Sequence, residues 1–256
     1  CRNVQAPALA ALLPKLHLNR HTPRAILFAG PKYGGLSLPE LYTDQGYGQL
    51  KLLIGHLKLG DDNGNLILSI LSHLQLYIGS SLPLFTLPYH QYAKWIEHNW
   101  ITSIWKHMSQ SDIIIDIQDT WVPKLTRVAD AMLMDLALTL HFNPAQLKQI
   151  NRCRLYLQLL TVSDLASADG REILPAIQQG HRDTQRISRL QWPVQQCPSE
   201  QDWVQWRIFL QHIGRGSKLV VQLGAWVAPT HQIWEWFQHK SKSIVYRKSP
   251  RTQEWT

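Results

Sequence analysis

The sequence predicts a mainly α fold, a helical bundle that contains an αα-hairpin, with a small antiparallel β element near the C-terminus. Two observations predict it. Apolar residues recur at helical spacing through most of residues 6–213, and β-type patterns are concentrated after Gly216. Hydrophobic residues make up 45% of the 256 residues, close to the average for globular proteins, so a disordered or fibrous chain is excluded.

Helices are expected to dominate the first half of the chain. Turns formed by PKYGG at residues 31–35 and by GDDNGN at residues 60–65 separate the first three of them. The uncharged run at residues 66–85 is long enough to cross a bilayer. Gly79 and Pro83 break this run and its polar residues share one face, so we predict an amphipathic core helix and no membrane partner. The helices expected here lie within residues 6–16, 43–59, 66–85 and 89–108.

An αα-hairpin is predicted in the middle of the chain, after one β-strand at residues 112–118 (DIIIDIQ). Its helices are expected over residues 128–140 and 144–160, and the pair Asn143-Pro144 is typical of a helix start. The residues that share the buried face of the second helix are Leu147, Ile150, Cys153, Leu157 and Leu160. The basic residues that fall outside this face are Lys148, Arg152 and Arg154.

The C-terminal part combines one helix with short β runs. Residues 166–189 are polar and predict a solvated connection or a short helix. Ser199 and Asp202 form a capping-box pattern for a helix that ends at Gly214. A small antiparallel sheet is predicted from β-rich runs at residues 218–227, 233–237 and 243–246.

These patterns divide the chain into three regions. They are a helical region over residues 1–110, a helical region with the hairpin over residues 111–190, and a helix with a small sheet over residues 191–256. The first residue is Cys1 and the other end is a strand-like run, so we expect the chain to be a piece of a longer protein. Three cysteines without CxxC spacing, in a sequence without a signal peptide, predict reduced thiols and an intracellular location, nucleus or cytoplasm.

The net charge of +8 is unevenly distributed. Residues 1–60 hold seven Lys/Arg against two Asp/Glu, and residues 171–256 hold twelve against six. The middle of the chain, residues 61–170, is acidic, with seven against ten. Basic surfaces attract phosphate backbones, so the two basic ends favour a nucleic-acid partner.

No motif in the sequence indicates catalysis. Asp61 and Asp62 follow a glycine as in the metal-binding hairpin of RNA-copying polymerases, but their neighbours predict helices and a solvated turn. His17 and His21 have the i, i+4 spacing of two zinc ligands without a third ligand. A hydrolase or metal enzyme that uses these four residues is an alternative. We expect no catalytic residue, no metal site and no cofactor in this chain.

Residues 19–48 show a distinctive order of residue types: a basic turn, a β run, a GG turn and an apolar LxLP. This order resembles the segment after the catalytic palm in reverse transcriptases of non-LTR (LINE-like) retroelements, where a P-x-x-GGLGLP-like motif opens the helical thumb. Ser37 stands where glycine is commoner in that family. Further similar segments are QLKLLIGHL (49–57), a stretch with WITSIW (92–105) and INRCRLYLQLLTV (150–162).

The resemblance implies that the chain is the thumb-like and post-thumb part of an RNA-directed DNA polymerase. Such a part is non-catalytic, because the family's catalytic carboxylates and their Mg²⁺ belong to a palm domain that would precede Cys1. That palm would be its protein partner, and an RNA–DNA or DNA duplex would be held through phosphate contacts. The residues expected to make these contacts are Arg20, Arg24, Lys32 and Lys51, beside a turn at Gly34 and Gly35.

Two further alternatives stay open. The hairpin also fits a helix-turn-helix module in which Lys148, Arg152 and Arg154 face phosphates. A decayed retroelement remnant without activity is the other. In addition, eleven Trp with only 17% charged residues predict an aromatic surface that a neighbouring domain covers and that makes the isolated chain self-associate. Its candidates are Trp95, Trp100, Trp105, Trp234 and Trp236, and the alternative is that these residues belong to the core.

Overall fold

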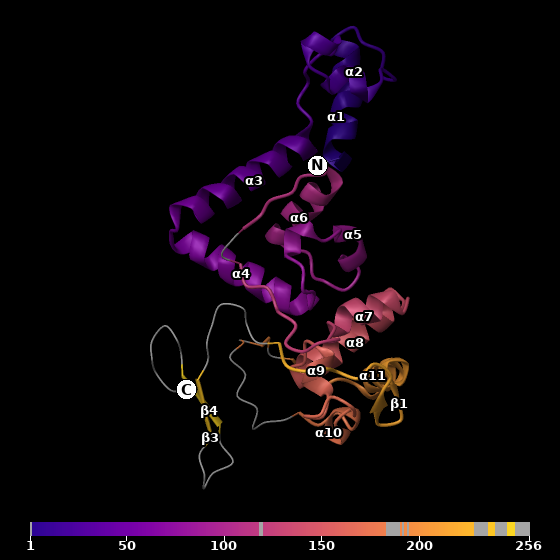
Figure 1. The fold of residues 1–256 in the computed structure, drawn as a ribbon. Coiled ribbons are helices and arrows are strands. Elements are labelled where there is room, and N and C mark those ends of the chain that lie inside the picture. The colour runs from indigo at the N-terminus through magenta and orange to yellow at the C-terminus, as the bar shows by residue number, and fades with distance from the viewer. Residues whose placement is uncertain are drawn as a thin grey trace.

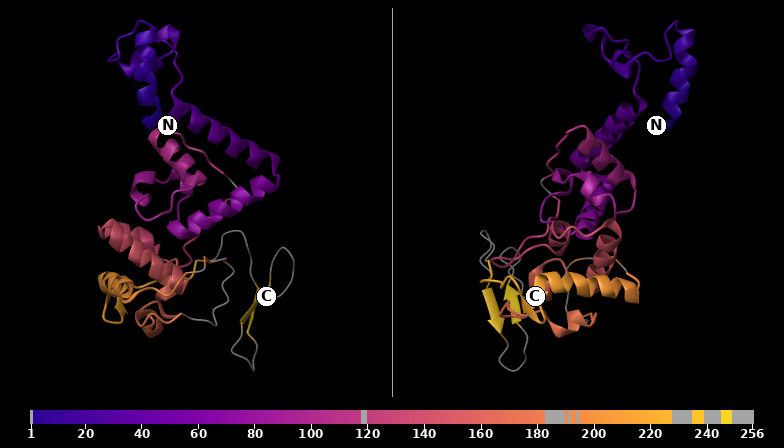
Figure 2. Two further views of the ribbon diagram at one scale, coloured as in Figure 1. Left: turned by 180° about the vertical axis from the view of Figure 1, so that it is seen from behind. Right: turned by 90° about the vertical axis from the view of Figure 1, so that its right-hand side faces the viewer.

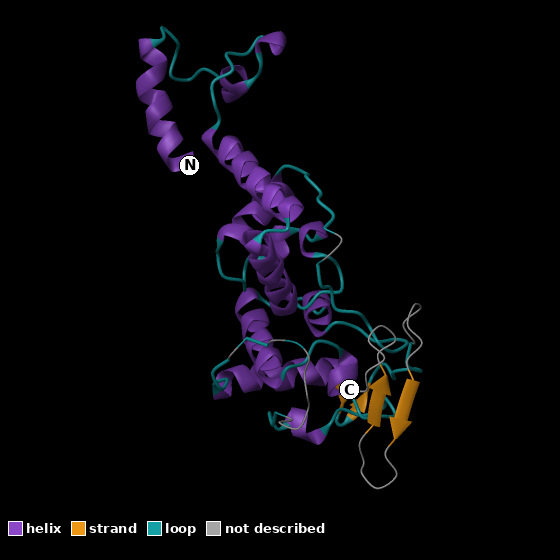
Figure 3. Ribbon diagram, turned by 90° about the vertical axis from the view of Figure 1, so that its left-hand side faces the viewer, coloured by secondary structure: helices purple, strands orange, loops and turns teal. Residues whose placement is uncertain are grey.

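The computed structural model describes residues 2–117, 120–182, 190, 192–193 and 195–227, and beyond them only the strands β3 (Glu235–Gln238) and β4 (Val245–Lys248). The fold is mainly α, as predicted, with small antiparallel β elements toward the C-terminus (Figure 1). Figure 3 shows that helices dominate everywhere except at that end. The molecule is elongated (Figure 2) and has an N-terminal lobe, a middle layer and a lower layer.

The N-terminal lobe, residues 2–39, lies at one end of the molecule (Figure 1). Its elements are α1 (Arg2–Lys15), α2 (Arg24–Phe28) and the 3-10 helix η1 (Pro31–Tyr33). Gln5 of α1 joins the lobe to the rest of the chain, because its amide Nε2 donates to the Pro39 carbonyl at 2.8 Å and its Oε1 accepts from the Leu41 amide at 3.2 Å. These bonds fix the lobe to the start of α3.

The middle layer is built around a pair of long helices that form a V (Figure 1). Its elements are α3 (Leu41–Leu59), α4 (Asp62–Ile78), η2 (Leu84–Thr86), α5 (Tyr89–Tyr92) and α6 (Trp100–Gln110). Helix α6 packs on α3, where a Cβ on Gly46 would lie 2.3 Å from the His107 ring, so the close approach requires glycine. Trp105 is fully buried and its indole Nε1 donates to the Leu87 carbonyl at 2.7 Å.

The lower layer contains α7 (Leu133–Thr139), α8 (Pro144–Leu157), α9 (Val162–Leu165), α10 (Pro175–Gln178) and α11 (Glu200–Ile213). The predicted αα-hairpin forms between α7 and α8, and α8 also packs along α11. Both predicted helix starts are confirmed. Asn143 accepts from the Gln146 amide at 3.0 Å, and Ser199 accepts from the Asp202 amide at 3.3 Å, each within a reciprocal capping box.

The β elements are two separate two-stranded antiparallel sheets. Strand β1 (Gly214–Arg215) pairs with β2 (Lys218–Leu219) directly after α11. Strand β3 pairs with β4, with Trp236 opposite Arg247. Trp234 lies outside the described residues.

Two predicted elements in the middle of the chain are wrong in type or length. The run at residues 112–118 forms no strand over its described part: Ile113, Ile115 and Ile117 pack against the core, Ile114 is 78% exposed, and no neighbouring strand pairs with them. The helix expected over residues 128–140 begins only at Leu133. The preceding backbone pairs with distant segments instead, through bridges of Arg127 with Trp226 and of Met132 with Thr161.

Candidate nucleic-acid interface

The GG turn of the N-terminal lobe is held by close backbone contacts. Gly34 has a φ of 76°, in the left-handed region that favours glycine. A Cβ on Gly35 would lie 2.0 Å from the Ala29 carbonyl oxygen, so no other residue fits there without moving the backbone. Beyond the turn, the amides of Leu36 and Leu38 donate to carbonyls of α2 at 2.9 and 2.8 Å.

These bonds also explain why the β run expected before the turn is wrong. Residues 24–28 form helix α2, and the segment after the turn folds back along it. The Leu36 and Leu38 amides donate to the carbonyls of Ile26 and Leu27. In a β-strand, these carbonyls would instead accept hydrogen bonds from a neighbouring strand. The result is a hydrogen-bonded unit of α2 and the turn within the lobe.

Three of the four candidate phosphate contacts lie together in this lobe. Arg20 and Arg24 flank the start of α2, and Lys32 is in η1; all three are exposed. Residues 1–39 contain five Lys/Arg and no Asp/Glu, so the lobe is uniformly positive. Glu40 lines the same small hollow as Arg24, but these two side chains form no ion pair in the part of the chain that the structure describes.

Lys51 stands apart from this group. It is exposed in the middle of α3, ten residues after Leu41. At a rise of 1.5 Å per residue, that places it about 15 Å along the helix from the lobe. A ligand that contacts both must therefore extend along α3 and cannot be a single phosphate group.

Two of the three basic residues that the helix-turn-helix alternative needs bond to groups of the protein itself. Arg154 is fully buried, so the prediction that it lies off the buried face is wrong. Arg152 donates through Nη1 to both carboxylate oxygens of Asp202, at 3.0 and 2.9 Å. Of the three basic residues that this alternative needs, Lys148 is exposed without a described ion pair.

Arg154 instead stabilises the junction between α8 and α4. Its guanidinium donates to the carbonyls of Leu76 at 3.0 Å, Tyr77 at 2.9 Å and Leu159 at 3.2 Å, and to Asn151 Oδ1. Burial lowers the pKa of Arg154 to about 9, so the group stays charged at neutral pH. A cation matched to carbonyls at a helix C-terminus suits the negative end of the helix dipole.

The GDD sequence has a structural role. Asp61 caps α4 by accepting from the Gly64 amide at 2.7 Å, and it pairs with His56 Nδ1 at 2.8 Å. The Gly64 amide and His56 lower the pKa of the Asp61 carboxyl. The turn connects two helices and leaves the Asp61 side chain 37% exposed, as predicted, and Asp61 has the additional role of a helix cap.

The two histidines at i, i+4 spacing do not share a helix face. They lie in the turns after α1, where His17 has a φ of 57°. Within the described ranges, no three His, Cys, Asp or Glu side chains gather as metal ligands would.

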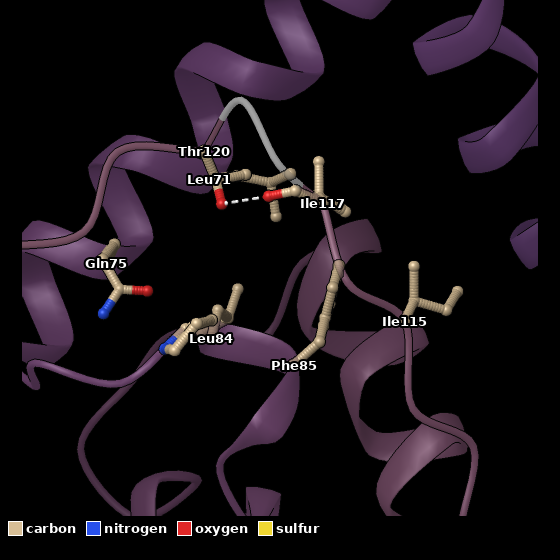
Figure 4. Close-up of a pocket in the computed structure, with 8 residues that line it drawn as sticks. Leu71, Gln75, Leu84, Phe85, Ile115, Ile117 and Thr120 are labelled. Carbon is tan, nitrogen blue, oxygen red and sulfur yellow. Dashed lines mark hydrogen bonds between the residues drawn. The ribbon is translucent and has the colours of Figure 1, made fainter.

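Figure 4 shows a hollow beside α4 that is too small for a ligand. Its volume is about 10 Å³, room for about one water molecule. Apolar side chains such as Leu71 and Phe85 line it, and the Gln75 amide Nε2 is already bonded to the carbonyls of Ser80 and Leu82, each at 2.8 Å. The hollow is a packing feature of the core.

The prediction of an exposed aromatic surface is wrong for two of its members. Trp95 is 2% exposed and Trp105 is fully buried, so both belong to the core. Trp100 is 37% exposed, whereas Trp226, which the sequence did not single out, is 64% exposed. Tyr33, an exposed ring within the PKYGG turn, is also absent from the predicted residues, although its position beside Lys32 is visible in the sequence.

Comparisons with protein-family models, with curated proteins and with solved structures found no match for this chain. None of the helices that the structure describes is both long and apolar enough to span a bilayer.

Proposed function

We propose that this chain binds nucleic acid through the phosphate backbone and that its N-terminal lobe makes the main contact. One observation carries the proposal: Arg20, Arg24 and Lys32 are exposed together on a lobe whose sequence contains no carboxylate before Glu40. When exposed cations of this kind contact phosphates, they displace the counterions condensed on the nucleic acid. This release drives binding that does not depend on the nucleotide sequence.

The proposed role is that of a reverse-transcriptase thumb of the non-LTR type, a non-catalytic part that holds an RNA–DNA or DNA duplex beside a palm domain of the same polypeptide. The resemblance at residues 31–39 supports this role, since the backbone at Gly34 and Gly35 has a physical need for the glycines of that motif. A polymerase partner also implies a nuclear or cytoplasmic location. Mg²⁺ would belong to the palm.

Affinity measured against salt concentration tests the proposal, with an RNA–DNA hybrid and a DNA duplex of equal length as ligands. Each phosphate contact contributes about −0.9 to the slope of log affinity against log salt on a duplex. Arg20→Glu with Arg24→Glu should flatten the slope by about 2 and weaken both duplexes alike, because phosphate contacts carry no base information.

A matched control tests whether the weakening depends on the position of the two arginines in the lobe or only on the net charge of the chain. Arg171 and Arg215 are exposed in the lower layer, and reversing both to Glu changes the net charge by the same amount. We expect that control to leave the slope nearly unchanged. Equal weakening by the two double variants would contradict the assignment to the lobe, and binding that is absent at low salt would favour a decayed remnant.

A further inference from the structure

Tyr33 stands out on the positive lobe as an exposed aromatic ring. It is 75% exposed at the end of η1. The ammonium Nζ of Lys32 lies over the ring, 4.7 Å from its centroid. A cation over an aromatic ring is attracted by the electrons of its face. With Lys32 in this position, Tyr33 still keeps 75% of its surface exposed to solvent.

The backbone around the ring is tightly hydrogen-bonded. The Tyr33 amide donates to the Gly30 carbonyl at 2.9 Å, and the Gly34 amide donates to the Pro31 carbonyl at 2.9 Å. The Gly35 amide also donates to the Gly30 carbonyl, at 3.2 Å. With proline at the start of the turn and Gly35 against Ala29, the segment presents the ring from a fixed support, which lowers the entropy lost on binding.

We infer that Tyr33 stacks on an unpaired base while Lys32 and the neighbouring arginines hold the adjacent phosphates, so that the lobe binds a single-stranded stretch of nucleic acid. This inference rests on the proposed function and adds an unpaired stretch to the duplex as a ligand of the same surface. Positive charge favours a polyanion over a protein partner here, because no carboxylate in residues 1–39 offsets it.

Stacking gives binding a component that depends on bases and not on phosphates. One base stacked on one aromatic side chain strengthens binding about 5- to 150-fold. Bases inside a duplex already stack on each other, so this component belongs to unpaired stretches only. The salt-dependent component remains on every ligand with the same number of phosphates.

The test compares oligo(dT) with an abasic oligonucleotide of equal length, which keeps the phosphates and lacks the bases. The full 256-residue chain should bind oligo(dT) more tightly. Tyr33→Leu should remove that preference, with a loss of about 5- to 150-fold on oligo(dT) and little change on the abasic strand. Tyr33→Phe keeps the ring and should keep the preference.

Tyr47→Leu is the matched control, because Tyr47 is 69% exposed but stands on the regular helix α3. We expect it to preserve the preference. Equal binding of both oligonucleotides by the unchanged chain, or an equal loss in the Tyr33 and Tyr47 variants, overturns the stacking assignment while phosphate binding stands. If the unchanged chain shows no salt-dependent binding to either oligonucleotide, the proposed function itself is overturned. Circular dichroism spectra confirm folding of each variant.

Discussion

At the scale of single residues, Ser37 holds a backbone conformation that favours glycine. It follows the GG turn and adopts a φ of 51°. A residue with a Cβ in the left-handed region is strained by roughly 1–2 kcal/mol. The Ser37 amide still donates to the Ala29 carbonyl at 3.0 Å, so the hydrogen bonds of the lobe hold the residue in this conformation.

Ser37→Gly should therefore stabilise the chain. Relief of strain exceeds the extra backbone entropy that glycine loses on folding, which is about 0.5–1 kcal/mol, so we expect the free energy of unfolding to rise by about 0.5–1 kcal/mol. Denaturant titration measures the change. Ser37→Ala also removes the hydroxyl but keeps the strain, so it should give no gain; equal effects of both substitutions would point to the hydroxyl instead.

Residue types predict exposure well on the lobe and poorly at α8. Arg20, Arg24 and Lys32 are exposed, as a run without carboxylates suggests. Arg154 looked equally exposed by its charge, yet it is buried because its acceptors are the Leu76 and Tyr77 carbonyls, 78 and 77 residues away in sequence. Local patterns hold no information on a partner so distant.

At the scale of elements, the sequence predicts helices whose ends carry their own signals. The capping residues Asn143 and Ser199 act within three residues, so the starts of α8 and α11 were predicted correctly. The run at residues 112–118 has β-type alternation, and its described part follows that alternation in burial, but a strand also needs a neighbour to pair with. Pairing is a property of the fold and not of the segment.

The cap of α11 should make stability depend on pH. Burial alone would raise the pKa of Asp202, but hydrogen bonds from Ser199 and the ion pair with Arg152 outweigh it and lower that pKa below its usual 3.8. A depressed carboxyl pKa stabilises the fold at pH values above 3.8, and this contribution is lost as pH falls through the lower folded pKa.

Asp202→Asn should accordingly lower the free energy of unfolding at neutral pH by about 1–2 kcal/mol, and the difference from the unchanged chain should shrink below pH 3.8. Urea titrations across this pH range check it. Glu200→Gln is the control, since Glu200 lies in the same first turn but is exposed, and surface ion pairs contribute little. A pH-independent difference for Asp202→Asn would contradict the linkage.

At the scale of the whole molecule, hydrogen bonds from α8 to the C-terminal end of α4 join the middle and lower layers. Arg154 and Asn151 of α8 both bond to the Tyr77 carbonyl at the C-terminal end of α4, the latter at 3.1 Å. Each buried carbonyl left without a donor costs about 1–3 kcal/mol. We therefore expect the junction to couple the opening of the two layers.

Arg154→Leu should break this coupling. The carbonyls of Leu76 and Leu159 lose their Arg154 donor and the Tyr77 carbonyl keeps only Asn151, so we expect the free energy of unfolding to fall by about 3 kcal/mol or more and the two layers to unfold in separate transitions. Hydrogen exchange should accelerate in the last turn of α4 as well as in α8. Arg154→Lys keeps the charge with fewer donors and should lose less. A single transition with faster exchange confined to α8 would show that Arg154 stabilises its own helix and does not join the layers.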